Sequence, residues 1–371
     1  MDIRALLMID GDDALPLAQL DVLGASVAQR TTDALLAAGV NSVSVVSAYP
    51  SAEVSQGAAP VRYVKSSPEE VWRDARKAYD ALAEGGADTV LLIRLNSYCE
   101  IDWQKFLGRH HAGVERLTRA LKSTPEPLDI YAVDPKFQRD TKFLFHARLT
   151  HPRMPAGNYQ VGEAEYAHPL RSARDLRQLA EDGLNLRSAM RPVGREVRPG
   201  VWMAEGSRVD AGVRLVAPLY LGRRVRVRTG CVVTRGSTLE HHSSVDCGTV
   251  IEHTTVLPFA TVGAGLDLSQ TIVGGRQVFD LKRDVAVEIH DRTLVDEAAH
   301  NAGWRLVTKA AALAAYLPLQ FWRGVSQRSH IPTLATDGAC VGDFAKIVDT
   351  EKQPAARVLR PGLVMERYGN Q

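Results

Sequence analysis

Carboxylates gather directly after the first apolar segment of the chain. Residues 3–9 (IRALLMI) are typical of a buried strand, and an acidic loop, residues 10–13, follows them. Such a loop could chelate a metal ion, but an acidic surface turn is the commoner arrangement, and we predict no metal site. Because strand ends in an open α/β sheet line a ligand-binding crevice, the polar residues after two apolar strands form a candidate substrate-binding set. They are Asp10, Gly11, Asp12, Asn96 and Asp102.

Histidines in the second half of the chain offer a different chemistry. An imidazole that titrates near neutral pH can take a proton from a hydroxyl or an amine, which is the general-base step of acyl transfer. We therefore keep His241 and His253 as candidate catalytic residues, only for the case that the protein is an acyltransferase. Acetyl-coenzyme A is expected as a cofactor under that alternative alone. Whether the two histidines can meet depends on the element that carries them.

That element is a six-residue repeat. Every sixth residue from 209 to 257 is Leu, Ile or Val, and the residue two positions earlier is mostly small or β-branched. The aliphatic positions are Val209, Leu215, Leu221, Val227, Val233, Leu239, Val245, Ile251 and Leu257. A period of six fits neither an amphipathic helix nor a simple strand, but it fits a parallel β-helix with three hexads in each coil. We expect the aliphatic column to point into the axis and the small column to lie at the corners.

The repeat resembles the hexapeptide-repeat, left-handed β-helix family, and we assign it to residues 196–293. Left-handed crossovers between parallel strands are rare, so the repeat alone does not predict the hand of the coil. The left hand is implied by the resemblance. The same fold serves acyltransferases, nucleotide-sugar enzymes and scaffolds. Residues 18 apart should stack, which places Arg228 beside Asp246. His241 and His253 are 12 apart and should lie on different faces, which leaves open only a site between the subunits of a trimer.

Residues 1–195 show a different pattern, in which apolar strands alternate with amphipathic helices. We predict strands at 3–9, 40–47, 89–95 and 128–133, and helices at 26–36, 69–82, 102–121 and 171–186. Continuous apolar strands of this kind belong to a parallel sheet that is covered on both faces. The predicted fold is therefore a Rossmann-like α/β domain, followed by the β-helix and by a helical C-terminal extension at 294–371.

The α/β domain resembles the sugar-1-phosphate nucleotidyltransferases, of which mannose-1-phosphate guanylyltransferase-like proteins are the nearest. The matching segments are Leu15-Pro16-Leu17, LDVLG at 20–24, LLAAGV at 35–40, the strand at 90–95 with Ile101-Asp102, and the helix at 106–111. The family often carries a hexapeptide β-helix behind this domain, so the resemblance covers residues 1–290. It implies a parallel sheet of nucleotidyltransferase type, a sugar phosphate or nucleotide sugar as ligand, and a place in sugar-nucleotide or surface-polysaccharide metabolism.

Three departures from the family pattern concern its chemistry. The family's first loop is rich in glycine and holds an Arg, whereas residues 10–13 contain only Gly11 and three carboxylates. The family uses a Lys shortly downstream, but the first Lys here is Lys65. Asn96 stands where the family places an Asp for Mg²⁺. We therefore expect a nucleotidyltransferase-like protein without pyrophosphorylase activity, without Mg²⁺ and with no certain cofactor. The alternatives are a hexapeptide acyltransferase acting on a sugar or sugar nucleotide, and a non-enzymatic scaffold or regulatory subunit.

Composition limits the partners. The chain has 371 residues, 45% hydrophobic and 24% charged, and a net charge of +2, so no general attraction to nucleic acid follows. It has no run of 18 apolar residues and no leader pattern, so we expect a cytoplasmic protein. We also expect a homo-oligomer. The segment 304–323 combines basic and aromatic residues, which suits either peripheral contact with a membrane or a helix packed on the protein.

Overall fold

The computed structural model describes residues 1–10, 17–48, 60–122, 127–136, 145, 156–162 and 165–297. Gly11, Asp12 and the segment 304–323 lie outside the described residues. The chain forms two compact units, which divide between Arg191 and Pro192, and each is described by itself. Within the described ranges, no helix combines the length and the apolar character that crossing a membrane requires.

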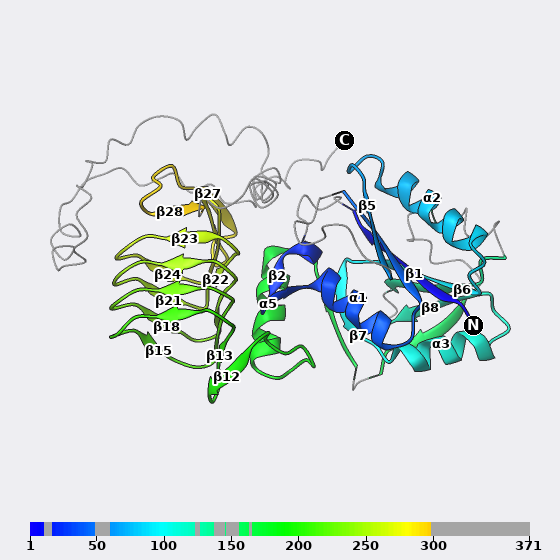
Figure 1. Ribbon diagram of the computed structural model, residues 1–371, viewed down its shortest axis with the longest axis horizontal. Coiled ribbons are helices and arrows are strands. Elements are labelled where there is room, and N and C mark those ends of the chain that lie inside the picture. Colours follow the sequence, from blue (N-terminus) through cyan, green and yellow to red (C-terminus); the bar gives the residue numbers. More distant parts are fainter. Residues whose placement is uncertain are drawn as a thin grey trace, which may run out of the picture. The chain divides into compact units, whose positions relative to one another are not determined.

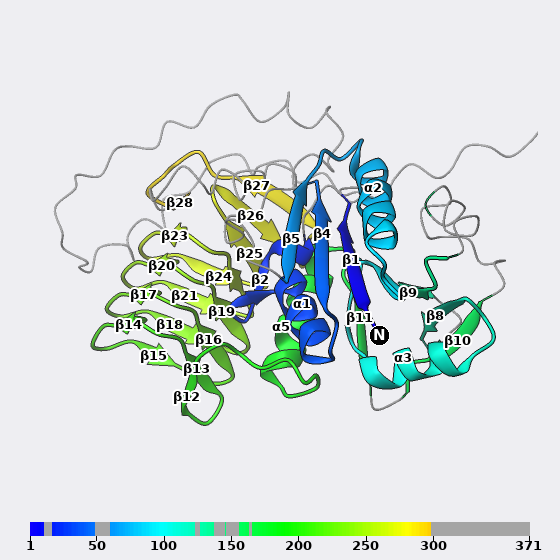
Figure 2. The same ribbon diagram turned by 45° about the vertical axis from the view of Figure 1, so that its right-hand side comes forward.

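The first unit is built on a seven-stranded mixed sheet in the order β10-β8-β9-β6-β1-β4-β5. Its strands are labelled between Figures 1 and 2. Its strands are β1 (Ile3–Ile9), β4 (Ser42–Ser47), β5 (Val61–Lys65), β6 (Thr89–Arg94), β8 (Leu117–Leu121), β9 (Pro127–Val133) and β10 (Gly157–Gln160). Strand β1 is central and runs parallel to β4 and β6. The predicted strands at 3–9, 40–47, 89–95 and 128–133 all lie in this sheet, as their apolar runs require.

The prediction of a purely parallel sheet was wrong at β9, which runs antiparallel to both β6 and β8. Strand β8 ends at Leu121 and β9 begins at Pro127. A connection this short cannot make the crossover that two parallel strands need, so the pair must be antiparallel. The predicted helix at 102–121 was also too long. Helix α3 (Trp103–Ala112) ends before Gly113, and β8 takes up the rest of that segment.

The helices of this unit begin at recognisable caps. Ser26 precedes α1 (Val27–Ala37), and its hydroxyl accepts a 3.1 Å hydrogen bond from the Gln29 amide, as predicted. Helix α2 (Val71–Glu84) buries Val71, Ala75 and Tyr79 against a core that includes β1 and β6. Helix α5 (Ala173–Leu184) starts with a capping box. The shorter elements are η1 (Leu17–Gln19), β2 (Asp21–Val22), β3 (Ala25–Ser26), and the antiparallel pair β7 (Ser97–Glu100) and β11 (Tyr166–Pro169).

The second unit stacks short strands into three sheets that the chain visits in turn (Figures 1 and 2). One sheet holds β13 (Val201–Met203), β16 (Leu219–Leu221), β19 (Ser237–Leu239), β22 (Thr255–Val256) and β25 (Thr271–Gly274). The next holds β14 (Arg208–Val209), β17 (Arg226–Val227), β20 (Ser244–Val245) and β23 (Ala260–Val262). The third holds β15 (Arg214–Leu215), β18 (Val232–Thr234), β21 (Val250–Glu252) and β24 (Asp267–Ser269). All neighbours among these strands are parallel, an arrangement compatible with a β-helix.

Antiparallel strands flank the coil stack. Strand β12 (Arg195–Arg198) pairs with β13 at the first coil. Strands β26 (Gln277–Asp280) and β27 (Val285–Glu288) extend the first sheet beyond β25, and β28 (Val295–Glu297) pairs with β23. These strands lie where the parallel stacking stops.

The aliphatic column of the repeat forms the core of this unit. Leu221 and Leu239 are register partners 18 residues apart, and both are fully buried. The small column lies at the corners, where its hydroxyls satisfy turn carbonyls: Ser243 Oγ donates to Glu240 O at 2.7 Å, and Thr249 Oγ1 donates to Gly263 O at 2.6 Å. Polar side chains can therefore be buried there without loss of hydrogen bonding.

Two details of the predicted repeat were wrong. Leu239 pairs with Val256, 17 residues later, so Val256 takes the inward place that we had predicted for Leu257. The turn before it is one residue shorter, with His253 at a φ of 46°. The glycines at 263–265 also do not end the stack, because β24 and β25 continue it. Gly265 has the positive φ that the corner glycines Gly212, Gly230 and Gly248 share, so it continues the pattern.

Candidate functional site

Charged and amide side chains meet at the carboxyl edge of the seven-stranded sheet. Asp10 directly follows β1, Arg94 is the last residue of β6, and Asn96 lies two residues further on. Asp129 is near the start of β9, and because β9 runs against β6, its start lies at the same edge. We call these four residues the Arg94 network. This edge is where open α/β sheets hold their ligands.

The arginine is paired on two sides. Arg94 Nε lies 2.9 Å from Asp10 Oδ2, and Arg94 Nη1 lies 3.6 Å from Asp129 Oδ2. Asn96 Nδ2 donates a 2.5 Å hydrogen bond to the same Asp129 oxygen. The guanidinium carbon is 5.8 Å from the ring centroid of Trp72 on α2, within cation–π range. The side chains of Arg94, Asp10 and Asp129 are only 15%, 9% and 7% exposed, so these charges interact with little solvent screening.

Asp129 is the residue of the Arg94 network with both a shifted pKa and an unusual backbone conformation. Burial raises the pKa of Asp129 to about 6, while the Arg94 guanidinium and the Asn96 hydrogen bond lower it and the Asp10 charge raises it. Its φ of 53° is in the left-handed region, which Asp tolerates better than most residues. The carboxyl therefore takes up a proton under mildly acidic conditions, and its charge at neutral pH depends on Arg94.

The donor set does not fit the Mg²⁺ ion that the family resemblance implies. Both carboxylates of the Arg94 network face a guanidinium, which stays charged at any working pH. A divalent cation placed between them would meet that positive charge at close range. In the part of the chain that the structure describes, His, Cys, Asp and Glu side chains nowhere gather in a group of three or more that could hold a metal ion.

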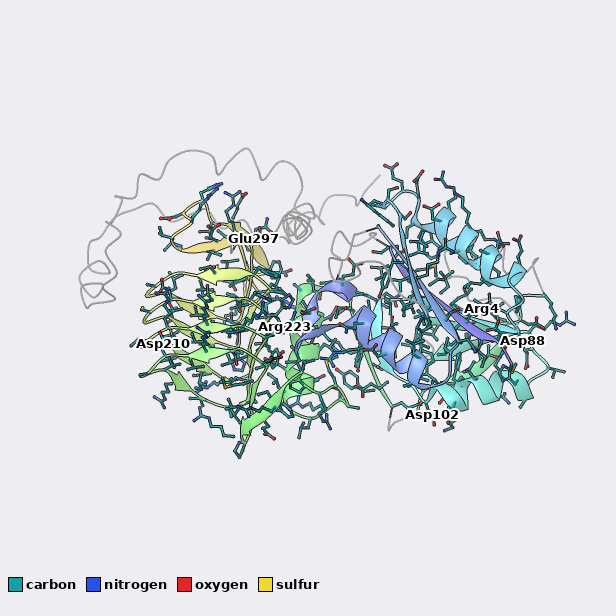
Figure 3. The ribbon with its side chains drawn as sticks, viewed as in Figure 1. Arg4, Asp88, Asp102, Asp210, Arg223 and Glu297 are labelled. Carbon is teal, nitrogen blue, oxygen red and sulfur yellow. The ribbon has the colours of Figure 1, made fainter. Side chains whose placement is uncertain are left out.

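The predicted substrate-binding residues separate into two groups. Asp10 and Asn96 both belong to the Arg94 network. Asp102 instead caps α3, where its Oδ1 accepts a 3.0 Å hydrogen bond from the Lys105 amide (Figure 3). Its own amide donates to Glu165 Oε1 at 2.9 Å, so its polar groups stabilise the start of a helix. Gly11 and Asp12, the remaining two, are not among the described residues.

Sequence reasoning missed Arg94, Asp129 and Trp72. A signal was present for the first two, because each interrupts an apolar strand with a charge: Arg94 in TVLLIR and Asp129 in PLDIYAV. A charged side chain in a buried strand needs a partner of opposite charge. An arginine and an aspartate in two buried strands of one sheet are therefore expected to form an ion pair. Nothing in the sequence indicated that Trp72 would lie over the guanidinium.

The two candidate catalytic histidines lie at different corners of the coil stack. His241 follows β19, and its ring lies 5.1 Å from that of Phe259, measured between centroids. The neighbouring His242 stacks on Phe259 at 4.8 Å. His253 follows β21 in another sheet. The predicted stacking of residues 18 apart also holds for Arg228 and Asp246, which form an exposed ion pair at 3.7 Å.

The Arg94 network yields a stability prediction. Arg94→Ala should lower the free energy of unfolding of the α/β unit by about 3–5 kcal/mol at pH 7, because two buried carboxylates lose their cation. The loss should shrink as the pH falls towards 6, because Asp129 without the Arg94 charge has a pKa above the wild-type value of about 6, and its protonation in the variant removes the unpaired charge. Hydrogen exchange of the β1 and β6 amides measures this for the α/β unit alone.

Arg73→Ala is the matched control for Arg94→Ala. Arg73 is 60% exposed and pairs with Glu70 on the surface of α2, so its removal should change stability by less than about 1 kcal/mol. If the β1 amides of the Arg94→Ala variant are as well protected from hydrogen exchange at pH 7 as those of wild type, the ion pairs described above do not exist in solution.

No family model matches the chain, and no curated protein sequence matches it.

Proposed function

We propose that the protein is a nucleotidyltransferase-like member of sugar-nucleotide or surface-polysaccharide metabolism, which binds a sugar phosphate or nucleotide sugar without pyrophosphorylase activity. The Arg94 network carries this proposal. It places hydrogen-bonding and charged groups at the ligand-binding edge of the sheet, yet it commits both carboxylates to an internal cation. The edge therefore keeps polar groups that suit a sugar or a nucleotide, while the two carboxylates described there, Asp10 and Asp129, are paired with Arg94 and do not suit Mg²⁺.

The architecture is consistent with the same family. A central parallel β1, flanked by β4 and β6, leads into the loop where the family binds its nucleotide. We further propose that the coil stack of the second unit is the left-handed β-helix that such proteins often carry. Its coils repeat every 17 or 18 residues over three sheets, and its corners hold residues with positive φ. This second unit would serve oligomerisation or a partner protein.

An acyltransferase remains the alternative, and the ring cluster of His241, His242 and Phe259 favours it. A single imidazole beside an aromatic wall suffices as a general base for acyl transfer. The separation of His241 from His253 removes an intrachain pair but leaves His241 able to act alone. A scaffold without any small-molecule ligand is the third reading of the same fold.

A ligand screen separates the three functions. We expect a nucleotide sugar or sugar 1-phosphate to raise the melting temperature equally in Mg²⁺ and in EDTA, as a ligand at 100 times its Kd stabilises by about 2.7 kcal/mol. Asp10→Asn should reduce the shift, and Glu84→Gln, an equal charge change on the exposed surface of α2, should not. A shift that only acetyl-coenzyme A produces, and that His241→Ala removes, would instead establish the acyltransferase. No shift with any ligand would favour the scaffold.

A further inference from the structure

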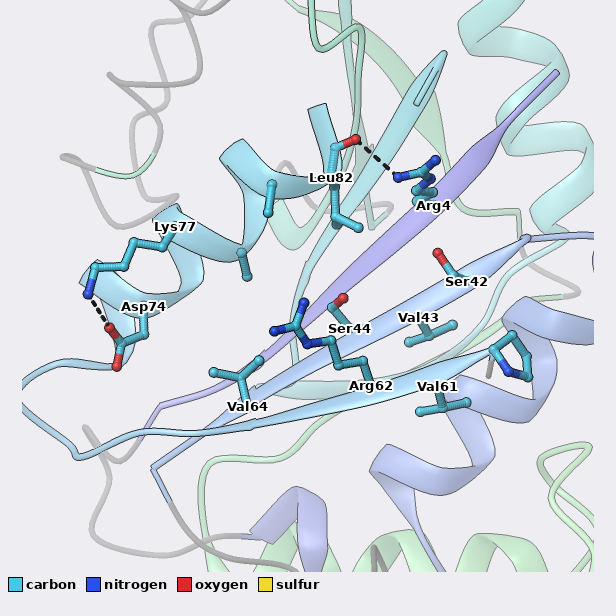
Figure 4. Close-up of a pocket in the computed structure, with 13 residues that line it drawn as sticks. Arg4, Ser42, Val43, Ser44, Val61, Arg62, Val64, Asp74, Lys77 and Leu82 are labelled. Atoms are coloured by element: carbon cyan, nitrogen blue, oxygen red, sulfur yellow. Dashed lines mark hydrogen bonds and ion pairs between the residues drawn. The ribbon is translucent and has the colours of Figure 1, made fainter. Parts of the chain in front are cut away.

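A groove lies on the α2 side of the sheet, over strands β4 and β5 (Figure 4). Its volume is about 580 Å³, and we call it the β4–β5 groove. Helix α2 forms one wall with Ala78, Ala81 and Leu82, while Arg62 rises from the edge strand β5. The groove shares no residue with the Arg94 network, so it requires an explanation of its own.

The sequence of β4 places hydroxyls on the floor of this groove. In SVSVVS, Ser42 and Ser44 alternate with the buried Val43 and Val45, so the serines share one face of the strand. Ser44 is the register partner of Arg62 on β5. Side chains of register partners lie about 5 Å apart, so the Ser44 hydroxyl and the Arg62 side chain enter the groove next to each other.

These three side chains have unused hydrogen-bonding capacity. Among the described residues, the Ser42 hydroxyl, the Ser44 hydroxyl and the Arg62 guanidinium have no hydrogen-bond or ion-pair partner. Ser44 is nevertheless only 7% exposed. Its hydroxyl oxygen is not sealed off by the protein, so it can donate a hydrogen bond to a ligand in the groove.

The charge around the groove selects the ligand. Arg4, Arg62 and Lys77 line it with a single carboxylate, Asp74, so the formal charge of the lining is positive. Lys77 already pairs with Asp74 at 3.1 Å. Arg4 is held by Asp2 and by the Leu82 and Gly85 carbonyls. The guanidinium of Arg62 can therefore donate its hydrogen bonds to a ligand, while Arg4 and Lys77 add positive charge around the groove.

We propose that the β4–β5 groove binds a phosphate monoester with a compact apolar body. The planar fork of Arg62 can donate two hydrogen bonds to phosphate oxygens, and the serine hydroxyls can donate to the others. The apolar body would lie on Ala78, Ala81 and Leu82 of α2, out of water. This site is independent of the ligand proposed for the Arg94 network.

Phenyl phosphate, inorganic phosphate and benzoate are the probes. Each is titrated into the full-length protein at constant ionic strength, and the amide resonances of β4 and β5 are followed by NMR. We expect phenyl phosphate to shift the Ser44 and Arg62 amides and to bind more tightly than inorganic phosphate, which lacks the apolar body. It should also bind more tightly than benzoate, which lacks the second charge and the third oxygen.

Two variants locate the binding. Arg62→Gln should weaken phenyl phosphate binding about tenfold or more, the effect of losing charge-assisted hydrogen bonds. Lys65→Gln is the matched control, because Lys65 lies on the same strand, alternates to the opposite face and does not line the groove. It removes the same charge and should change affinity by less than about twofold.

Three results would overturn the proposal. The first is full affinity in Arg62→Gln, which would place the bound phosphate elsewhere. The second is an equal loss in Lys65→Gln, which would reveal a general charge effect. The third is the absence of any shift in β4 or β5 at millimolar phenyl phosphate. Both variants change exposed residues, so they should melt like wild type, and Ser44→Ala provides an independent loss of one donor if Arg62→Gln does not fold.

Discussion

Leu239→Asp is expected to prevent the coil stack of the second unit from folding. Leu239 is fully buried in the middle of the stack, between its register partners Leu221 and Val256. Losing a packed leucine side chain costs about 2–5 kcal/mol. Protonating the new carboxyl at pH 7 costs about 4 kcal/mol more, because its unperturbed pKa lies about 3 units lower. The total is comparable to the whole stability of a typical domain, about 5–15 kcal/mol.

The control for Leu239→Asp changes an aliphatic residue on the outside of the same stack. Val232 is half-buried on β18, next to the inward Val233, and its register partner is Arg214. Val232→Asp should therefore keep the fold and gain a cation across the strand pair. Circular dichroism melting and soluble yield distinguish the two variants. A soluble Leu239→Asp protein that melts cooperatively within a few degrees of wild type would show that the inward column has been assigned to the wrong face.

The coil stack is the part of this fold that sequence reasoning predicted best, because every coil repeats one environment. The prediction held from Val209 to Ile251 and then slipped by one residue. The slip could not be read from the period, since Val256 and Leu257 are both aliphatic and both buried. It comes from the turn after β21, where two residues, His253 and Thr254, stand in place of the three residues 235–237 of the coil before.

In the α/β unit, apolar runs located the strands but not their directions. The antiparallel β9 follows from its short connection to β8, and the predicted helix at 102–121 concealed that connection because it covered the residues of β8. Strand β5 was missed because VRYVK is an edge strand with alternating polar residues and little burial. Local periodicity reports how a segment is buried, whereas direction and order depend on the chain connections.

The sequence predicted two of the four residues of the Arg94 network. Asp10 and Asn96 were found because residues after parallel strands gather at one edge. Arg94 and Asp129 were missed because their importance lies in a pairing across two strands that neither strand reveals alone. This pairing changes the physical reason for expecting no pyrophosphorylase activity. The sequence argument relied on missing groups, and the structure adds that Arg94 pairs with the carboxylates of Asp10 and Asp129.

The most direct test of the central claim is Mg²⁺-dependent pyrophosphate release from a nucleoside triphosphate and a sugar 1-phosphate. Phosphoryl transfer spreads negative charge over the phosphate oxygens, and enzymes of this type oppose it with a metal and with cationic side chains. Here Arg94 is already paired with Asp10 and Asp129, so its charge is not available to oppose that of a phosphate. Each missing stabilising group typically costs a factor of ~10²–10³, so the loss of several leaves no useful rate.

We expect purified wild-type protein to release pyrophosphate at the background rate with any common sugar 1-phosphate and triphosphate. Asn96→Asp should not restore activity, because the new carboxylate would replace the amide that donates to Asp129 and would repel it. A known pyrophosphorylase in the same assay provides the positive control. Pyrophosphate release above background that requires Mg²⁺ and is lost in Asp10→Asn would contradict the account and would make this protein an active nucleotidyltransferase.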